Sequence, residues 1–260
     1  MTYCRRVGSA RTYAPGTPSW VDLEAPDLDR ASAFYRDLFG WEADGDSPDY
    51  RMFRLGDADV AGLSPLTGPG PRWVAYVTVA DLDAAAGLAA DRGGAVLAGP
   101  MVITTAGRLA VVADDQGATL ALWQPGDHVG ADVVDEPGAL CWIELACRDD
   151  GAAKAFYGAV LGWSGETHPF GGTSGYTEFT PAGGTRPVAG MVRMNEQWPD
   201  DVPPRWMVYF AVADPGAAAA RVAELGGAVS VPPFDLPRVG RLAVVQDPDG
   251  AVFTVMARAG

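Results

Sequence analysis

The sequence predicts an α+β protein of two tandem domains, each built from two copies of a module in which a strand and a helix are followed by further strands. Three observations predict this organisation: a long internal repeat, four helices that begin at an aspartate and end near a glycine, and strands in which apolar and polar residues alternate. At 260 residues the chain is long enough for two domains, each with a core of its own.

The repeat relates the two halves of the chain. The segment PSWVDLEAPDLDRASAFYRDLFGW, which begins at residue 18, returns as ALCWIELACRDDGAAKAFYGAVLGW, which begins at residue 139. Further matches follow in the same order, with two insertions in the second copy. So many matches in register predict that the halves share one fold. The matched pairs include Trp20 and Trp142, Tyr50 and Tyr176, Gly62 and Gly190, Trp73 and Trp206, Arg108 and Arg241, and Gly117 and Gly250.

Four helices are predicted, one in each module. Asp27, Asp81, Asp149 and Asp214 stand where a carboxylate can accept bonds from the free N–H groups of a first helical turn, and a glycine follows each helix. Pro215 is suited to a first helical position. The first helix carries an apolar stripe that should pack on a sheet. Its members are Leu28, Ala31, Phe34, Tyr35 and Leu38.

The strand before the first helix alternates in character. In WVDLEA, Val21, Leu23 and Ala25 point to one side and Trp20, Asp22 and Glu24 to the other. One side should pack under the helix, and the other should line the inside of a curved sheet. The predicted boundaries are an N-terminal arm at 1–17, a first domain at 18–124, a linker rich in Gly, Pro and acidic residues at 125–138, and a second domain at 139–260.

Composition narrows the classes of partner. A formal net charge of −14 disfavours nucleic acids and anionic membrane surfaces and would attract cationic small molecules, although an acidic surface more often serves solubility. No segment is typical of a signal peptide or a membrane span, which favours a cytoplasmic protein. Cys4, Cys141 and Cys147 are odd in number and lack ligand or redox spacing, which favours a reducing compartment.

The motifs resemble those of the vicinal-oxygen-chelate superfamily of glyoxalases, bleomycin-resistance proteins and extradiol dioxygenases. The resemblance rests on DLDRASAFYRDLFGW with DDQG, on DDGAAKAFYGAVLGW with DPDG, and on GTPSWVDL and VGRLAVV, which resemble the tandem two-domain actinobacterial type. It covers residues 18–258, nearly the whole chain. It implies that the two βαβββ modules of each domain form a curved mixed β-sheet cup with the helices outside.

The resemblance also implies where a metal would bind. Metal-dependent members use a His on the first strand, a His or carboxylate on the fifth, and a Glu after the D-P-x-G turn. These positions hold Trp20, Val74 and Ala121 in the first domain, and Trp142, Met207 and Thr254 in the second. None of these side chains is a competent ligand for a divalent metal. His128 and His168, the only histidines, cannot supply two imidazoles to one such site, so no metal cofactor is expected.

Aromatic side chains are predicted to line the cups. Trp20 and Tyr76 in the first domain, and Trp142 and Tyr209 in the second, have the strand parity of the mapped ligand positions. Such faces suit a flat conjugated guest, and cation–π attraction would favour a positively charged one. The alternative is that these rings only fill the core. Trp41, Trp73, Trp163 and Trp206 are assigned to the core.

Each cup is also predicted to hold one carboxylate. Asp22 and Glu144 each lie two residues after the tryptophan, on the same face. Such a group would be a counter-ion for a ligand amine or a general base with a raised pKa. The alternative is a salt bridge to an arginine such as Arg72 or Arg205, or a solvated strand end. Two further arginines, Arg108 and Arg241, are expected to give similar pairing at the cups. The predicted ligand-binding residues are therefore Trp20, Asp22, Val74, Tyr76, Arg108 and Ala121 in the first domain, and Trp142, Glu144, Met207, Tyr209, Arg241 and Thr254 in the second.

Two functions therefore remain open from the sequence. The first is a metal-free protein that binds an aromatic natural product or drug, either neutral or cationic, for sequestration or self-resistance. The second is a metal-independent enzyme of secondary metabolism, of hydroxylase, isomerase or cyclase type, with Asp22 or Glu144 as base. A third, structural role requires filled cups. A monomer is expected, because fusion of the two domains can replace the dimer contact that single-domain relatives use.

Overall fold

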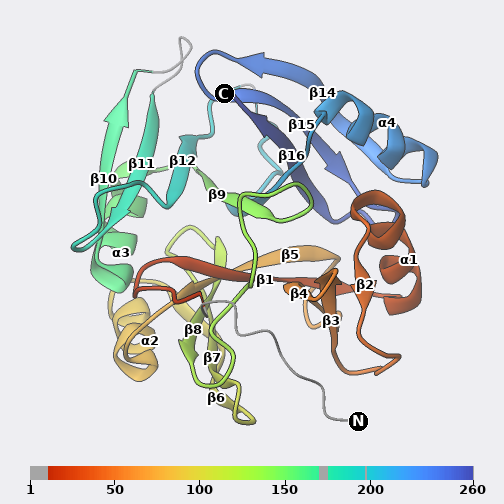
Figure 1. Cartoon of the computed structure of the whole chain (residues 1–260). Coiled ribbons are helices and arrows are strands. Elements are labelled where there is room, and N and C mark those ends of the chain that lie inside the picture. Colours follow the sequence, from red (N-terminus) through yellow and green to blue (C-terminus); the bar gives the residue numbers. More distant parts are fainter. Residues whose placement is uncertain (1–10, 170–174, 197, 260) are drawn as a thin grey trace.

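The computed structural model describes residues 11–169, 175–196 and 198–259. Within them the chain forms two eight-stranded sheets and four helices (Figure 1). Cys4 lies outside the described residues. The first half comprises β1 (Pro18–Ala25), α1 (Leu28–Phe39), β2 (Glu42–Ala43), β3 (Arg51–Leu55), β4 (Ala58–Pro65), β5 (Arg72–Thr78), α2 (Leu82–Asp91), β6 (Ala95–Ile103), β7 (Gly107–Ala113) and β8 (Thr119–Pro125). The second half comprises β9 (Leu140–Cys147), α3 (Asp150–Leu161), β10 (Trp163–His168), β11 (Tyr176–Pro181), β12 (Ala189–Arg193), β13 (Arg205–Ala211), α4 (Pro215–Glu224), β14 (Ala228–Leu236), β15 (Gly240–Gln246) and β16 (Val252–Arg258).

The two sheets have the same mixed topology. Their strand orders are β2-β3-β4-β1-β5-β8-β7-β6 and β10-β11-β12-β9-β13-β16-β15-β14. In each sheet the first strands of the two modules pair antiparallel at the centre, and each is flanked on its other side by a parallel strand from its own module. The predicted α+β fold of two tandem domains, each of two βαβββ modules, is therefore confirmed.

The four predicted helix starts are confirmed by their cap hydrogen bonds. The Asp27, Asp81, Asp149 and Asp214 carboxylates each accept a bond from a backbone N–H in the first turn, at 2.7–3.0 Å. Such a cap stabilises a helix by about 1 kcal/mol, because it satisfies a donor that has no partner within the helix. At the C-terminal end of α1, Gly40 has φ of 76°, a left-handed conformation that favours glycine.

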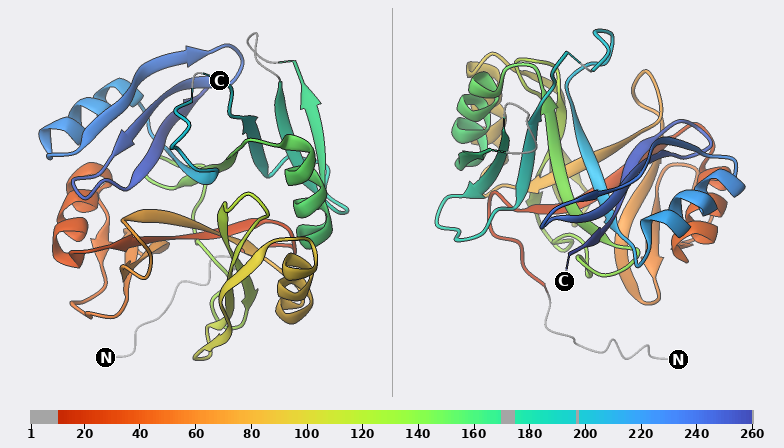
Figure 2. Two further views of the ribbon diagram at one scale, coloured as in Figure 1. Left: turned by 180° about the vertical axis from the view of Figure 1, so that it is seen from behind. Right: turned by 90° about the horizontal axis from the view of Figure 1, so that it is seen from above.

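The two sheets share one core. The convex faces of the two sheets, which lie opposite the cups, pack against each other. Figure 2 shows the helices at the margins, with α1 beside α4 and α2 beside α3. Trp73 on β5 packs against Phe210 on β13, with ring centroids 4.9 Å apart. The four tryptophans assigned to the core all belong to this single cluster, which confirms their assignment. The outer, concave face of each sheet is left to form a cup.

Two equivalent hydrogen bonds join the two domains. The Trp41 indole N–H of the first domain donates to the carbonyl of Gly138, which lies just before β9, at 2.7 Å. The Trp163 indole of the second domain donates to the carbonyl of Gly16, just before β1, also at 2.7 Å. The tryptophan that follows the first helix of each domain is therefore bound to the start of the other domain. Among the described residues, no helix is long and apolar enough to cross a membrane.

Candidate ligand-binding site

Each sheet carries a separate cluster of side chains on its concave face. Cup 1 denotes the cluster of Trp20, Val74, Tyr76, Ala121, Trp123 and Ala131. Cup 2 denotes the cluster of Cys141, Ala146, Met194, Met207, Tyr209, Leu242 and Met256, against which Trp142 packs. The strand alternation inferred from the sequence thus placed the aromatic residues on the correct face.

In cup 1 the Asp22 carboxylate gathers three donors. Its Oδ1 atom accepts from Trp20 Nε1 at 2.8 Å and from the Tyr50 hydroxyl at 2.9 Å, and its Oδ2 atom accepts from the Tyr76 hydroxyl at 2.5 Å. Asp22 is buried, at 6% exposure. Burial raises the pKa of this carboxyl above its ordinary value, although the three hydrogen bonds lower it.

In cup 2 the Glu144 carboxylate takes the equivalent place. Its Oε1 atom accepts from the Tyr209 hydroxyl at 2.8 Å, and Tyr176 also donates to the carboxylate. The Trp142 indole donates to the Tyr176 hydroxyl at 2.9 Å instead of to the carboxylate. Burial raises the pKa of Glu144, and the two phenols oppose that rise. Thr254 is hydrogen bonded to Tyr209 and extends the network.

A glycine on the neighbouring strand makes room for each phenol. A Cβ atom at Gly62 would lie within contact distance of both the Asp22 carboxylate and the Tyr50 hydroxyl, and one at Gly190 would overlap the Tyr176 hydroxyl. Neither glycine has a positive φ, so space and not backbone conformation requires them. The sequence repeat paired these tyrosines and glycines, but they were not recognised as site residues. Their repetition in register was the signal that could have identified them.

The two cups differ in what covers them. Over cup 1 the segment between β8 and β9 folds back, with Ala131 N bonded to the Ser19 carbonyl at 2.8 Å. The His128 ring stands edge-on to Trp20 at 4.6 Å, and Tyr13 donates to the Ala131 carbonyl at 2.7 Å. Trp20 consequently keeps only 3% exposure. Cup 1 is therefore closed by the chain itself.

Cup 2 is more open. Trp142 and Glu144 are both half-buried, whereas their counterparts in cup 1 are buried. The insertion before β13 contributes Trp198 and Val202, which pack against the cup 2 cluster and partly cover it. Arg148 holds this segment by donating to the Val202 and Pro199 carbonyls. Cup 2 thus leaves Trp142 partly exposed beside a carboxylate.

The assignment of Arg108 and Arg241 to the cups was wrong. Arg108 forms a two-bond ion pair with Asp83 on α2, at 2.9 and 3.0 Å, and Arg241 pairs with Asp235 at 2.9 Å. Side chains alternate along β7 and β15, and the neighbouring leucines, Leu109 and Leu242, occupy the cup faces instead. The arginine next to Asp22 does not neutralise it either, because Arg72 pairs with Glu24 at 2.9 Å.

The mapped metal positions do not fit a metal ion. Trp20, Val74 and Ala121 lie together in cup 1, while Met207 lies in cup 2 with Trp142 and Thr254 on adjacent strands. These six side chains offer no imidazole, thiolate or carboxylate to a divalent cation. Nor do the described residues place three or more His, Cys, Asp or Glu side chains together in a group suited to a metal. The structure therefore supports no step through a metal held at these positions.

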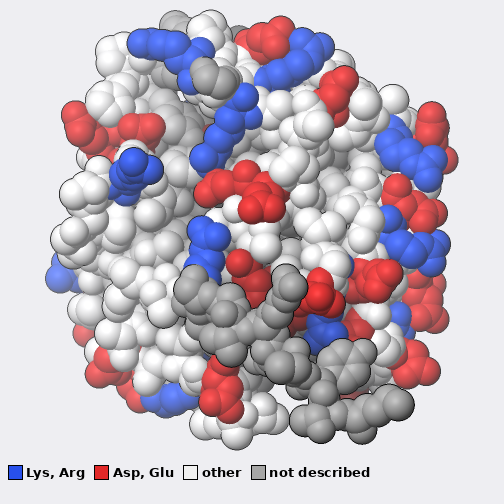
Figure 3. Space-filling model, in the orientation of Figure 1, with Lys and Arg blue, Asp and Glu red and all other residues white. Residues whose placement is uncertain are grey.

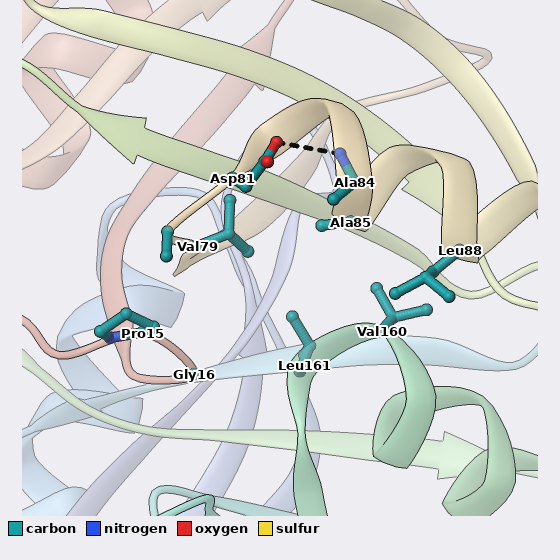
Figure 4. Close-up of a pocket in the computed structure, with 10 residues that line it drawn as sticks. Pro15, Gly16, Val79, Asp81, Ala84, Ala85, Leu88, Val160 and Leu161 are labelled. Atoms are coloured by element: carbon teal, nitrogen blue, oxygen red, sulfur yellow. Dashed lines mark hydrogen bonds between the residues drawn. The ribbon is translucent and has the colours of Figure 1, made fainter.

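Two surface hollows lie away from the cups. One, of about 190 Å³, lies at the seam between α2 and α3 (Figure 4). It is lined mainly by apolar side chains such as Leu88, Val160 and Leu161, and its carboxylate, Asp81, already caps α2. The other lies beside α1, where Arg51 pairs with Asp29 at 2.8 Å. Apart from Arg51, the charged side chains around this second hollow lie on the surface, whereas each cup holds a carboxylate and aromatic rings together, so the cups are the candidate sites.

Charged side chains of both signs are mixed on the face of the molecule seen in Figure 3. On the face shown in Figure 3, acidic and basic side chains alternate along the right-hand side. This mixed pattern is typical of a surface that keeps a protein soluble.

Comparison with known proteins gives the family. Residues 17–122 match the model of the Glyoxalase/Bleomycin resistance protein/Dioxygenase superfamily, and residues 142–256 match the Glyoxalase-like domain. "Putative glyoxylase CFP32" of Mycobacterium tuberculosis (strain CDC 1551 / Oshkosh) is 39% identical over 254 residues, which cover 94% of this chain and 95% of that protein. "Anthracycline biosynthesis protein DnrV" of Streptomyces peucetius is 37% identical over 264 residues, with 94% of each chain covered.

Solved structures share the fold at low identity. The Mn(II)-bound glyoxalase from Novosphingobium aromaticivorans aligns with a TM-score of 0.64 and 16% identity, over 93% of this chain and 82% of that one. The 2,3-dioxygenase LapB from Pseudomonas sp. KL28 aligns with a TM-score of 0.65 and 14% identity, over 96% and 94%. With both domains matched and relatives similar over almost their whole length, the chain belongs to the Glyoxalase/Bleomycin resistance protein/Dioxygenase superfamily.

Proposed function

We propose that this protein binds a planar aromatic small molecule in cup 2, without a metal ion held by the protein, and sequesters it. One observation carries the proposal: Trp142 remains half-buried beside the Glu144 carboxylate, while the equivalent Trp20 is covered. An indole face suits a flat ring, and a carboxylate with two phenols can fix its orientation by hydrogen bonds. Two relatives named for anthracycline biosynthesis support an aromatic natural product as the ligand class.

Catalysis by Glu144 is the second candidate. Burial raises the pKa of this carboxyl, and a raised pKa suits a general base that works near neutral pH. Tyr209 and Tyr176 hold the carboxylate in place, so it could take a proton from a bound ring system. The same contacts serve a group that only binds, and so substitution experiments must separate the two functions.

The test measures the affinity of anthraquinone-type ligands by isothermal titration calorimetry, which does not depend on tryptophan emission. Trp142→Ala is expected to weaken binding by about 1–3 kcal/mol, by analogy with stacking of bases on aromatic side chains. Trp20→Ala in the covered cup is the matched control: it costs stability but should leave the affinity unchanged. Equal losses from both variants, or none from Trp142→Ala, would exclude cup 2 as the binding site.

Glu144→Gln separates binding from catalysis. If the protein only binds, the variant alters affinity and there is no turnover to lose. If Glu144 is a base, affinity stays nearly constant while the rate of product formation falls by about 10²–10⁴-fold. Mass spectrometry of the ligand after incubation with the wild type and the variant distinguishes these results.

A further inference from the structure

A half-buried ion pair at cup 1 has only one of its two members in cup 2. In cup 1, Glu24 and Arg72 lie opposite each other on β1 and β5, and Arg72 Nη2 is 2.9 Å from Glu24 Oε2. The corresponding register pair on β9 and β13 is Ala146 and Arg205. A methyl group therefore stands where the carboxylate would be, while the arginine is kept.

Arg205 has no compensating partner among the residues that the structure describes. No ion pair between described residues includes Arg205, whereas Arg72 is paired with Glu24. The Nε atom of Arg205, like that of Arg72, is buried without a hydrogen-bond partner. Burial alone lowers the pKa of the guanidinium, with no acidic neighbour to raise it. An arginine keeps its charge at neutral pH, so a cation is held half-buried without an anion. A partly desolvated cation of this kind gains more from an incoming anion than a fully solvated one does.

The position of Arg205 points to that partner. Met207 and Tyr209 follow it at alternate positions of β13 and belong to cup 2, so Arg205 lies on the same side at the end of the cup. Met207 is the register partner of Glu144, which places Arg205 about 7 Å further along the strand. One aromatic ligand can span this distance.

We propose that cup 2 takes an aromatic ligand that carries an anionic oxygen, a carboxylate, with Arg205 as its counter-ion and Trp142 against its ring. This inference rests on the proposed function and names its ligand class. The planar guanidinium matches a carboxylate through two parallel hydrogen bonds. The net charge of −14 opposes an anion at long range, but salt screens exposed charges beyond about 8 Å, whereas the contact with Arg205 is close and partly desolvated.

The experiment compares anthraquinone-2-carboxylate with anthraquinone-2-carboxamide, which differ in charge and hardly in shape. Each ligand is titrated into the protein with and without the Trp142→Phe change. The difference between the two fluorescence decreases gives the signal that comes from Trp142. The wild type is expected to bind the acid about ten-fold more tightly than the amide. A difference of this size corresponds to one charge-assisted hydrogen bond, which the amide cannot form. Arg205→Gln should abolish this preference. Arg241→Gln, which removes one positive charge from the same domain outside the cup, should keep it.

A second variant tests the missing carboxylate. Ala146→Glu rebuilds the ion pair of cup 1, and it should remove the preference for the acid although Arg205 is intact. Because it gives the cation a partner, it should also raise the Tm by about 2–4 °C without any ligand. Arg205→Gln provides the same comparison of acid and amide if Ala146→Glu does not fold.

The outcomes separate this inference from the proposed function. Equal Trp142-dependent binding of acid and amide by the wild type would overturn the anion site and leave aromatic binding in place. A preference that survives Arg205→Gln would also overturn it. If neither probe quenches Trp142, the proposed function fails for this ligand class and the inference falls with it.

Discussion

The hydroxyl of Tyr35 on α1 donates to the carboxylate of Asp247, before β16, at 3.1 Å, and so joins the first domain to the second. Trp73 donates to the same hydroxyl at 3.0 Å. The repeat produces the reverse link, in which Tyr157 of the second domain donates to Asp114 of the first at 2.9 Å. The Phe-Tyr helix motif and the Asp turn motif are therefore partners across the domain boundary.

Tyr35→Phe tests this link. The change leaves the buried Asp247 carboxylate without one donor and the Trp73 indole without its acceptor. We expect the free energy of unfolding to fall by about 1–3 kcal/mol, the cost of leaving buried polar groups unsatisfied. Urea unfolding measures the loss, and Tyr157→Phe should cause a similar one. A change below the error of the fit in both variants would show that water replaces the phenols.

The raised pKa of Glu144 predicts how stability depends on pH. A carboxyl whose pKa is higher in the folded than in the unfolded state takes up protons more readily when folded, so its protonation favours folding. Relative to Glu144→Gln, the wild type should gain stability as the pH falls from neutral toward 4.5, the ordinary value of the group, and lose it as the pH rises. Unfolding free energies at several pH values give the difference. A constant difference would contradict a raised pKa.

Gly190→Ala should disrupt cup 2 without touching the carboxylate itself. The added methyl would overlap the Tyr176 hydroxyl and lie 2.8 Å from Trp142 Nε1, so the phenol must leave Glu144. Ligand affinity and stability should both fall, stability by about 1–3 kcal/mol. Gly62→Ala is the matched control in cup 1, and it should cost stability but not affinity. Unchanged affinity in Gly190→Ala would separate the Tyr176 contact from binding.

The six mapped metal positions carry no imidazole, thiolate or carboxylate, so the purified protein is expected to carry no stoichiometric transition metal. Elemental analysis of untagged protein should give far less than one zinc, iron, nickel or manganese per domain, and Mn²⁺ should not raise the Tm. A bound metal stabilises the folded state by mass action, so a clear upward shift would reveal a site. That shift, or one metal per domain, would contradict the assignment of the six mapped positions.

Local patterns predicted the fold well because their causes are local. A cap carboxylate such as Asp27 bonds within one helical turn, and alternation decides which face Trp20 takes. The contacts missed by the sequence analysis join distant segments. The fold of the linker over Trp20 depends on where the whole sheet lies, as does the meeting of Tyr176 with Glu144. The repeat could not place Arg108, because a repeated residue can lie on either face of a strand. Side-chain alternation along β7 puts Leu109 in the cup and Arg108 on the opposite face.

The shared core leads to the last prediction, that the protein is a cooperative monomer. Trp73, Phe210 and Phe253 come from both sheets and lie in one buried cluster. Either domain alone would therefore expose the apolar face that packs in this cluster to water. The tandem arrangement thereby supplies within one chain the contact that two copies would otherwise make. Sedimentation should give a single species near 27.1 kDa, and urea should produce one transition by both fluorescence and circular dichroism. A heavier species would mean that another surface, such as the exposed edge strand β6, also pairs between chains, whereas two separate transitions would mean that the convex faces of the sheets do not bind the domains together.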